Sequence, residues 1–481
     1  MAGETRQLLI GGDSVPALDG RTTDDLNPFT GEVHAVVAAG GKADVTRAVD
    51  AAQAAFPTWA ATSPSARRRI LLKAADLLES RTPDVVAVMA AEVGGVGGWA
   101  GFNAMLAANI LREAAAAVSQ PVGEVLTTDT PGQLSLALRE PLGVVAAFAP
   151  WNAPVILSTR AVAAPLAAGN TVVLKPSEDA PIAAGLFIAE VLHEAGLPAG
   201  ALNVVTNAPE DAAEVAEALI TDPRVRAVNF TGSTEVGRIV GTLAAQHLKP
   251  AVLELGGKNS LLVLDDADLD HAVDAATFGA FHNAGQICMS TDRVLVHRSV
   301  AEEFTAKLVA KVASLPHGDP ADPGTVIGPV INQRAAGRVA ALVAEAVEHG
   351  ARVRTGNDGT ATVLDNVTPR MRIFQEEIFG PAVVVVPVED DDEAVAIAND
   401  TEHGLTAGIM TEDSRRGLGL AQRIQTGIVH VGNQTVDDEP QAPFGGVKAS
   451  GYGRFGGRWG VEAFSATRWV TIAGEHGHFP F

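Results

Sequence analysis

The sequence contains very little of three kinds of residue. Its 481 residues include one cysteine and one tyrosine, and aromatic residues make up 5%. A single cysteine excludes an intrachain disulfide and any zinc site built from several thiolates. The lone thiol, Cys288, is therefore either an inert buried side chain or a reactive group.

Basic residues and long apolar runs are also scarce. The 35 basic and 57 acidic side chains give a formal net charge of −22, which argues against nucleic acid and anionic membranes as partners because both are polyanions. The most apolar segment, 141–157, is interrupted by Pro150 and Pro154 and is too short to span a membrane. Residues 1–20 lack the basic and apolar segments of a signal peptide, so we expect a cytoplasmic protein.

Helical and strand patterns alternate along most of the chain, which predicts an α/β fold with mainly parallel sheets. The first half predicts a Rossmann-like, doubly wound cofactor lobe. The alternation restarts after Gly256-Gly257 and predicts a second, catalytic α/β lobe. Ser63-Pro64 is predicted to open one helix, and Ser299 with Glu302 to form a capping box at another. The strands predicted in the first half are 144–147, 171–174, 203–205 and 227–230.

Two segments of the first half could bind a nucleotide. Gly232 and Gly237 lie where a predicted strand enters a helix, and such a junction offers free N–H groups to a pyrophosphate. The spacing differs from Gly-x-Gly-x-x-Gly, and a plain tight turn is the alternative. Lys175 and Glu178 follow another strand, where they could hold ribose hydroxyls or simply flank a turn.

Three further side chains could carry chemistry. Cys288 lies in the segment 285–290, where a glycine and mixed polarity allow a partly exposed thiol. Glu254 ends a predicted strand just before two glycines, so it is a candidate base or an ordinary strand-end carboxylate. Asn152, between two prolines, is a rigid hydrogen-bond donor or part of an Asx turn.

In this order, these motifs resemble those of the aldehyde dehydrogenase superfamily. The resemblance extends from 27–31 (NPFTG) through 376–381 (EEIFGP) to 443–448 (PFGGVK), which is most of the chain. It implies that Cys288 is the nucleophile, Glu254 the general base, and Asn152 the amide that holds the oxyanion. The implied cofactor-binding residues are Trp151, Lys175, Ser177, Glu178, Gly232, Ser233, Gly237, Leu255, Glu377 and Phe379.

The resemblance also implies the reaction and the cofactor. An aldehyde would form a thiohemiacetal on Cys288 and then a thioester, which water releases as a free acid. Glu178 would accept hydrogen bonds from the adenosine ribose and repel a 2′-phosphate, which favours NAD. Lys175 offsets part of that repulsion, so use of NADP stays open.

A closer resemblance is to bacterial salicylaldehyde, vanillin and benzaldehyde dehydrogenases. It rests on 99–103 (WAGFN), 149–154 (APWNAP), 285–291 (GQICMST) and 450–453 (SGYG). It implies a small aromatic aldehyde as the substrate. The candidate substrate-binding residues are Trp99, Phe102, Arg160, Ile287, Met289, Val436 and Tyr452.

Other functions stay open at this point. Within the family, an aliphatic or semialdehyde dehydrogenase is the main alternative. Outside it, a thiol esterase or hydrolase would need a histidine near Cys288, and His282 is the nearest in sequence. We expect no metal site, because the histidines lack ligand spacing apart from His476 and His478.

The resemblance finally implies a division into domains. It places an NAD-binding domain at 1–118 and 139–255, a catalytic domain at 256–448, and an oligomerisation element at 119–138 and 464–481. Strands of such an element pair across subunits, so we expect a homodimer or homotetramer.

Overall fold

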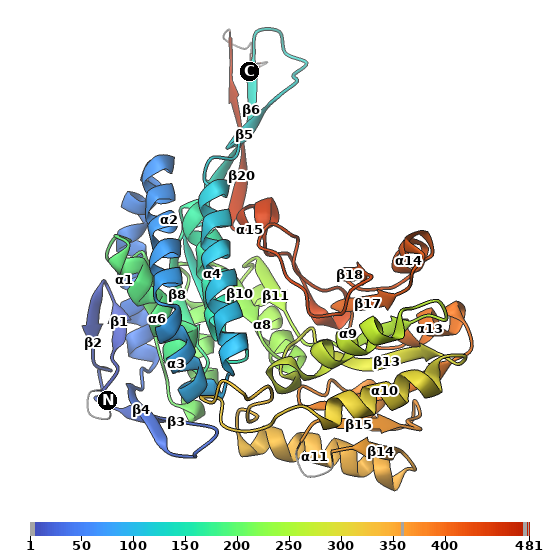
Figure 1. Cartoon of the computed structure of the whole chain (residues 1–481). Helices are drawn as coiled ribbons and strands as arrows, with labels where there is room; N and C mark the ends of the chain where they lie inside the picture. The colour runs from blue at the N-terminus through green and yellow to red at the C-terminus, as the bar shows by residue number, and fades with distance from the viewer. Residues whose placement is uncertain (1–4, 357–359, 475–478, 480) are drawn as a thin grey trace.

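The computed structural model describes residues 5–356, 360–474, 479 and 481. Two large sheets, each covered by helices, form two lobes that lie side by side, and a thin β arm projects from them (Figure 1). The α/β architecture with a doubly wound sheet confirms the predicted fold class. None of the described helices is long and apolar enough to cross a membrane.

The first lobe contains an eight-stranded sheet in the order β19-β11-β10-β7-β8-β9-β1-β2. Its strands from β11 to β9 run parallel, whereas β19, β1 and β2 are antiparallel additions. The strands are β1 (Leu8–Ile10), β2 (Asp13–Val15), β7 (Val144–Ala149), β8 (Thr171–Pro176), β9 (Leu202–Val204), β10 (Val225–Thr231), β11 (Ala251–Glu254) and β19 (Gly451–Tyr452). The helices of this part of the chain are α1 (Lys42–Ala60), α2 (Pro64–Ser80), α3 (Thr82–Val93), α4 (Gly97–Ala117), α5 (Pro154–Ala168), η1 (Ile182–Leu186), α6 (Phe187–Glu194), η2 (Pro209–Asp211), α7 (Ala212–Thr221) and α8 (Thr234–Gln246).

Strand β7 shows why helices cover both faces of this sheet. Successive side chains of a strand point to opposite faces. Val145 and Ala147 belong to the core formed with α2, α4 and α5, whereas Val144 and Ala146 belong to the core formed with α1 and α7. Every residue of β7 is buried, as expected for a central parallel strand.

The chain order of the first sheet reverses beside β7. From β7 the chain proceeds to β8 and β9 on one side, and then returns to add β10 and β11 on the other. In open α/β sheets, ligands bind in the crevice at the carboxyl ends of the strands at such a switch point. Here that crevice receives the segments after Ala149 and after Thr231.

The second lobe contains a seven-stranded sheet in the order β14-β15-β16-β13-β12-β17-β18. All its strand pairs are parallel except β14 with β15. The strands are β12 (Asn259–Val263), β13 (Thr291–His297), β14 (Arg352–Thr355), β15 (Thr362–Asp365), β16 (Ala382–Val388), β17 (Thr406–Met410) and β18 (Ile428–Val431). The helices of this part of the chain are α9 (Leu269–Phe281), η3 (His282–Gly285), α10 (Ala301–Ala313), α11 (Gln333–Glu348), α12 (Arg372–Gln375), α13 (Asp391–Asn399), α14 (Ser414–Ala421) and η4 (Lys448–Ser450). The last helix, α15 (Gly457–Ala463), packs against α4 and α5 of the first lobe.

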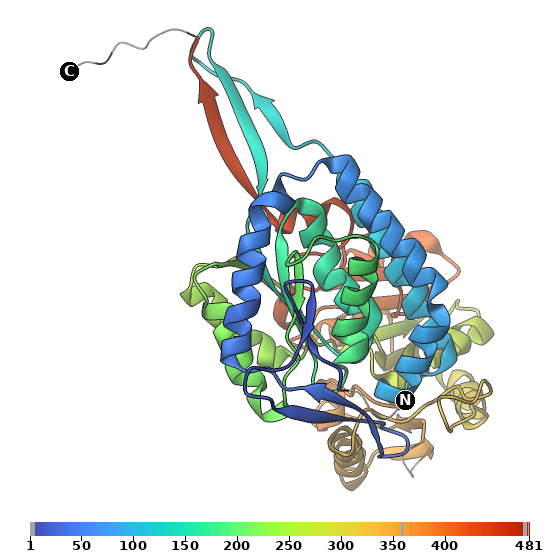
Figure 2. The same cartoon turned by 90° about the vertical axis from the view of Figure 1, so that its left-hand side faces the viewer.

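The arm is an antiparallel sheet of β5 (Gly123–Leu126), β6 (Leu134–Pro141) and β20 (Ser465–Ile472), in the order β20-β6-β5. Figures 1 and 2 both show it extending well beyond the helices of the first lobe. Its strands fall in or beside the ranges predicted for the oligomerisation element, of which residues 475–478 and 480 lie outside the described part. A hairpin of β3 (Thr22–Leu26) and β4 (Val33–Ala38) completes the strands.

Two helix starts test the predicted caps. Ser63 caps α2, and its hydroxyl accepts the Ala66 N–H as predicted. The capping box predicted at Ser299 is wrong, because α10 begins after Val300 and the Ser299 hydroxyl instead hydrogen-bonds the His297 ring at 2.7 Å.

Glu92 ties the first-lobe helices together. This fully buried carboxylate on α3 accepts the backbone N–H groups of Ile182 and Ala183, each at 2.7 Å. Both donors belong to the first turn of η1, whose N–H groups have no partner within the helix. Burial raises the pKa of Glu92 to about 7, and these two hydrogen bonds oppose the rise.

We predict that Glu92→Ala lowers the free energy of unfolding by about 2 to 5 kcal/mol, because two buried N–H groups lose their acceptor. Glu92→Gln should fall between this variant and the wild type, since an amide oxygen can still accept one bond. Glu217→Ala, at an exposed position of α7, is the control. Chaotrope unfolding curves measure the effect, and equal midpoints for Glu92→Ala and Glu217→Ala would contradict it.

Candidate active site

Cys288 lies in a strained loop between α9 and β13. Asn283 and Ala284 have φ angles of 50° and 54°, which residues with a Cβ rarely adopt. Gly285 follows with φ +69°, and a Cβ there would lie 2.2 Å from the Gly380 carbonyl oxygen. Such strain persists where the surrounding structure holds the backbone, as at catalytic sites. The loop therefore presents Cys288 at a fixed place.

Asn152 connects this loop to the first lobe. It follows β7 at the switch point, and its side-chain amide donates to the Gln286 carbonyl at 3.0 Å. The backbone carbonyl of Asn152 accepts hydrogen bonds from the Trp99 indole N–H at 3.0 Å and from the Asn283 side-chain amide at 2.9 Å. An amide nitrogen carries two hydrogens, so one N–H of Asn152 remains available in the pocket that it lines.

Glu254 reaches the same place from β11. The Gly257 turn that follows it packs against the cysteine loop, since a Cβ on Gly257 would lie 2.5 Å from the Cys288 carbonyl oxygen. Glu254 is 1% exposed, and neither of its carboxyl oxygens has a hydrogen-bond partner among the described residues. A buried carboxylate without donors is costly, so this residue is poised to take up a proton.

The electrostatics of the two acids follow from burial. Burial raises the pKa of Glu254 to about 8, against the opposing effects of Arg160 and Arg454. Burial also raises the pKa of the Cys288 thiol well above its usual value, and the charges of Glu254 and Glu377 raise it further. At neutral pH both acids are therefore largely protonated.

A small pocket opens at Cys288. Its walls are mostly apolar, which suits a small ligand with a hydrophobic body. The lining residues are Trp99, Phe102, Asn152, Ala153, Ile156, Leu157, Arg160, Ile287, Cys288, Met289, Val436, Asp438 and Phe444.

Six of the seven predicted substrate residues line this pocket, and Tyr452 does not. Tyr452 lies on β19, which pairs with β11 at the edge of the first sheet, and it is 51% exposed. Its place on an edge strand, rather than in the loops around Cys288, keeps its ring away from the pocket.

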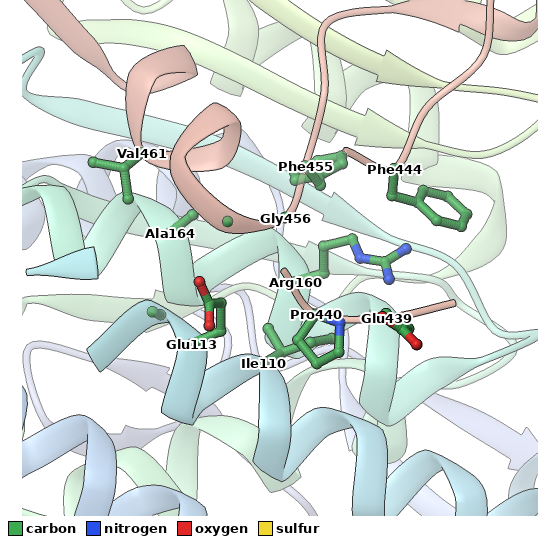
Figure 3. Close-up of a pocket in the computed structure, with 12 residues that line it drawn as sticks. Ile110, Glu113, Arg160, Ala164, Glu439, Pro440, Phe444, Phe455, Gly456 and Val461 are labelled. Atoms are coloured by element: carbon green, nitrogen blue, oxygen red, sulfur yellow. The ribbon is translucent and has the colours of Figure 1, made fainter. Parts of the chain in front are cut away.

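The structure adds lining residues that the sequence interpretation missed. Ala153 precedes the first residue of α5, and Ile156, Leu157 and Arg160 follow within the helix. Their spacing places all four on one helix face, so the sequence could have predicted them as lining residues. Asp438 pairs with Arg160 across 278 residues of chain, which no local pattern reveals. Arg160 and Phe444 also line a second pocket between α4, α5 and α15 (Figure 3).

The predicted adenosine-binding residues come together at the carboxyl end of β8. Lys175 and Glu178 form an ion pair, and the Asn207 amide donates to Glu178 at 3.0 Å. Burial alone would raise the pKa of Glu178, but Lys175 and these hydrogen bonds lower it below its usual value. The carboxylate is thus ionised. Ser177 lies in the same turn, with its hydroxyl accepting the Asp179 N–H.

The first turn of α8 contains the residues predicted to bind the pyrophosphate. Ser233 caps the helix, and its hydroxyl accepts the Val236 N–H. Gly232 and Gly237 are both closely packed, since a Cβ on Gly237 would lie 2.2 Å from the Leu255 side chain. Ser233 and Val236 are exposed, so the positive end of this helix is open to an anion such as a pyrophosphate.

Glu377 and Phe379 belong to the second lobe and contact residues of the first. The Glu377 carboxylate accepts the Gly257 N–H at 2.9 Å, which places it beside the turn that follows Glu254. The Phe379 ring meets the Trp151 ring edge-on at 5.6 Å. Phe379 has φ 48°, a strained backbone for a residue with a Cβ. Glu377 and Phe379 are the residues predicted to hold the ribose of the nicotinamide.

His282 does not form a thiol–imidazole pair. Its ring stacks on Phe278 at 4.5 Å and meets Trp99 edge-on at 5.0 Å. Burial lowers the pKa of His282 to about 4. His282 therefore does not supply the basic imidazole that a cysteine hydrolase needs near its nucleophile. Within the described residues no cluster of three potential metal ligands occurs, and His476 and His478 lie outside them.

Comparison with known proteins agrees with this geometry. The profile of the aldehyde dehydrogenase family matches residues 15–470. The chain belongs to the aldehyde dehydrogenase family. It is accordingly an oxidoreductase of a family that uses nicotinamide dinucleotides.

Individual members of this family are very similar to the chain. A vanillin dehydrogenase of Pseudomonas fluorescens is 54% identical over 478 residues, which cover 98% of this chain and 99% of the relative. A salicylaldehyde dehydrogenase of Pseudomonas sp. strain C18 is 45% identical, with 99% of both chains covered. The crystal structure of a salicylaldehyde dehydrogenase from Pseudomonas putida G7 complexed with salicylaldehyde matches with a TM-score of 0.97 and 43% identity over 100% of both chains.

We predict that Gly285→Ala lowers turnover at least tenfold while the protein still folds, because the added Cβ displaces the cysteine loop and small misplacements of reacting groups are costly. Gly337→Ala on α11, where a Cβ meets open space, is the control and should slightly raise stability. Steady-state rates and thermal unfolding of both variants test this. Full activity of Gly285→Ala would show that the loop is not held as described.

Proposed function

We propose that this protein oxidises small aromatic aldehydes to carboxylic acids, with NAD as its preferred cofactor. The observation that carries the proposal is that Cys288 and Asn152 line one apolar pocket while the turn that follows Glu254 packs against the Cys288 loop. The names of the related vanillin and salicylaldehyde dehydrogenases support the substrate class. The pocket around the thiol is lined by aromatic and aliphatic side chains, which suit an aromatic substrate better than a charged aliphatic one.

In this proposal the Cys288 thiol loses its proton to solvent, and the thiolate attacks the aldehyde carbonyl to form a thiohemiacetal. The free N–H of the Asn152 amide and the Cys288 backbone N–H hold the oxygen that becomes negative, and losing one such donor raises the barrier by about 3 to 4 kcal/mol. The nicotinamide cofactor, when bound, accepts the hydride. Glu254 then takes a proton from water, which attacks the thioester and releases the acid.

The cofactor would lie across the switch point. Lys175, Ser177 and Glu178 would hold the adenosine ribose, and the open first turn of α8, with Gly232, Ser233 and Gly237, the pyrophosphate. Leu255 and Trp151 would flank the nicotinamide, with Glu377 and Phe379 at its ribose. The ionised Glu178 favours NAD, since a 2′-phosphate would meet a negative charge that Lys175 only partly offsets.

The alternatives have less support. A semialdehyde substrate needs a free cation for its carboxylate, and Arg160, the guanidinium that lines this pocket, is already paired with Asp438. A thiol hydrolase needs a basic histidine near the thiol, and His282 lies instead in an aromatic stack.

We also propose that the arm joins copies of this chain as a homodimer or homotetramer. It exposes apolar side chains on strands whose outer edges, within the described residues, lack a partner, and such edges readily pair with another strand. The single unpaired thiol fits a reducing compartment such as the cytoplasm. The exposed apolar residues of the arm are Val122, Val125, Leu126, Leu134, Trp469 and Ile472.

We predict that absorbance of reduced cofactor appears fastest with benzaldehyde, salicylaldehyde and vanillin, and more slowly with straight-chain aldehydes and succinate semialdehyde. Measured with each cofactor, kcat/KM should be higher with NAD than with NADP because of the charge on Glu178. A preference for succinate semialdehyde would overturn the aromatic substrate. A preference for NADP would overturn the role given to Glu178.

Variants of the two acids separate the half-reactions. Cys288→Ala should lose aldehyde oxidation, by a factor of at least about 10³, and still bind NAD. Glu254→Gln should release up to one reduced cofactor per site in a rapid burst and then stall, because the thioester is not hydrolysed. Stopped-flow absorbance measures both. Normal steady turnover by Glu254→Gln would exclude it as the deacylation base.

The pH dependence follows from the raised pKa of Glu254, about 8. The base works in its ionised form, so activity is low below this pKa and rises as the pH passes through it. We expect kcat to increase about tenfold per pH unit below about pH 7 and to level off above about pH 9. A kcat that stays constant over this range would place the limiting step elsewhere.

A further inference from the structure

A buried ion pair forms part of the wall of the catalytic pocket. Arg160 on α5 and Asp438, in the segment after β18, are bonded to each other and are 6% and 5% exposed at their side chains. Both line the pocket that contains Cys288. The charges of both also act on Glu254 and on Cys288, in opposite directions, so the pair lies close to the reacting groups.

Only half of the Asp438 carboxyl group is satisfied. Its Oδ2 accepts a hydrogen bond from Arg160, whereas its buried Oδ1 has no hydrogen-bond partner among the described residues. A buried carboxylate oxygen without a donor destabilises a protein unless water or a ligand supplies one. Because Asp438 lines the pocket, the donor can come from the molecule that occupies it.

We infer that Asp438 Oδ1 accepts a hydrogen bond from a hydroxyl group on the ring of the substrate, so that the pocket selects phenolic aldehydes. This inference rests on the proposed function, and it adds a residue that determines specificity.

The Arg160–Asp438 pair disfavours ring substituents of the substrate other than a hydroxyl group. The Arg160 guanidinium is bonded to Asp438 and lies 4.2 Å from the centre of the Phe444 ring, so it is not free to bind a substrate carboxylate. A carboxylate would also be repelled by Oδ1. A methoxy group has the size to fit but carries no hydrogen to donate, so it leaves Oδ1 unpaired. A phenolic hydroxyl, in contrast, supplies the hydrogen that Oδ1 lacks.

The size of the preference follows from this chemistry. A site with a buried polar group discriminates against an analogue that leaves the group unpaired more strongly than an apolar wall discriminates by size. We therefore expect a preference of roughly 10- to 100-fold in kcat/KM for a hydroxybenzaldehyde over the methoxybenzaldehyde with the same ring position.

Asp438→Asn tests this most sharply. Arg160 can only donate, so it holds the new amide by its oxygen and turns the amide N–H₂ toward the pocket, where Oδ1 had been. The variant thus replaces an acceptor with a donor at nearly the same shape. The ratio of kcat/KM for hydroxy- over methoxybenzaldehyde should fall toward one or below. Glu439→Gln, a neighbour that lines only the second pocket (Figure 3), should keep the wild-type ratio.

The full experiment compares 2-, 3- and 4-hydroxybenzaldehyde with their methoxy counterparts and with benzaldehyde, in the wild type and both variants. The double variant Asp438→Leu with Arg160→Met removes both charges and should also abolish the preference, which covers the case in which Asp438→Asn does not fold. A wild type without hydroxyl preference at any ring position, or an unchanged ratio in the folded Asp438 variants, overturns the inference alone. A wild type that oxidises none of these aldehydes overturns the proposed function and this inference with it.

Discussion

Burial of the Glu254 carboxyl near the Cys288 thiol governs the chemistry of this protein. Glu254 is buried and neither of its carboxyl oxygens has a hydrogen-bond partner among the described residues, whereas Cys288 is partly buried in the wall of the pocket. Losing water disfavours the charged form of each acid, and a charge on one disfavours a charge on the other. Before substrate binds, the Cys288 thiol and the Glu254 carboxyl are therefore both protonated at neutral pH.

The rest of the fold holds these acids together. Glu254 ends a strand of the first sheet, whereas Cys288 comes from a loop beside the second sheet, so neither lobe contains the site alone. Asn152 joins the two through its bond to the cysteine loop. The strained backbone at Ala284 and the close approach of Gly285 to Gly380 leave that loop little freedom. Rigidity of this kind fixes the thiol before any substrate binds.

Much of this could be predicted from the sequence, because strand–helix alternation and the turn residues at strand ends act locally. The helix start at Ser63 and the α/β architecture are of this kind. Features that depend on distant parts of the chain were missed. Asp438 lines the pocket as the partner of Arg160, which lies far away in the sequence. Tyr452 lies at a sheet edge because its strand pairs with β11, and the residues next to Tyr452 in the sequence do not indicate this pairing. At Ser299 a nearby histidine competes for the hydroxyl that was expected to cap a helix.

The central claim is that Cys288 carries the acyl group and Glu254 releases it. The most direct measurement is mass spectrometry of Glu254→Gln after incubation with NAD and benzaldehyde, followed by peptide mapping. The account predicts a mass increase of one benzoyl group per chain, located on the peptide that contains Cys288 and removed by hydroxylamine. Absence of this adduct, together with continued formation of benzoate, would contradict it.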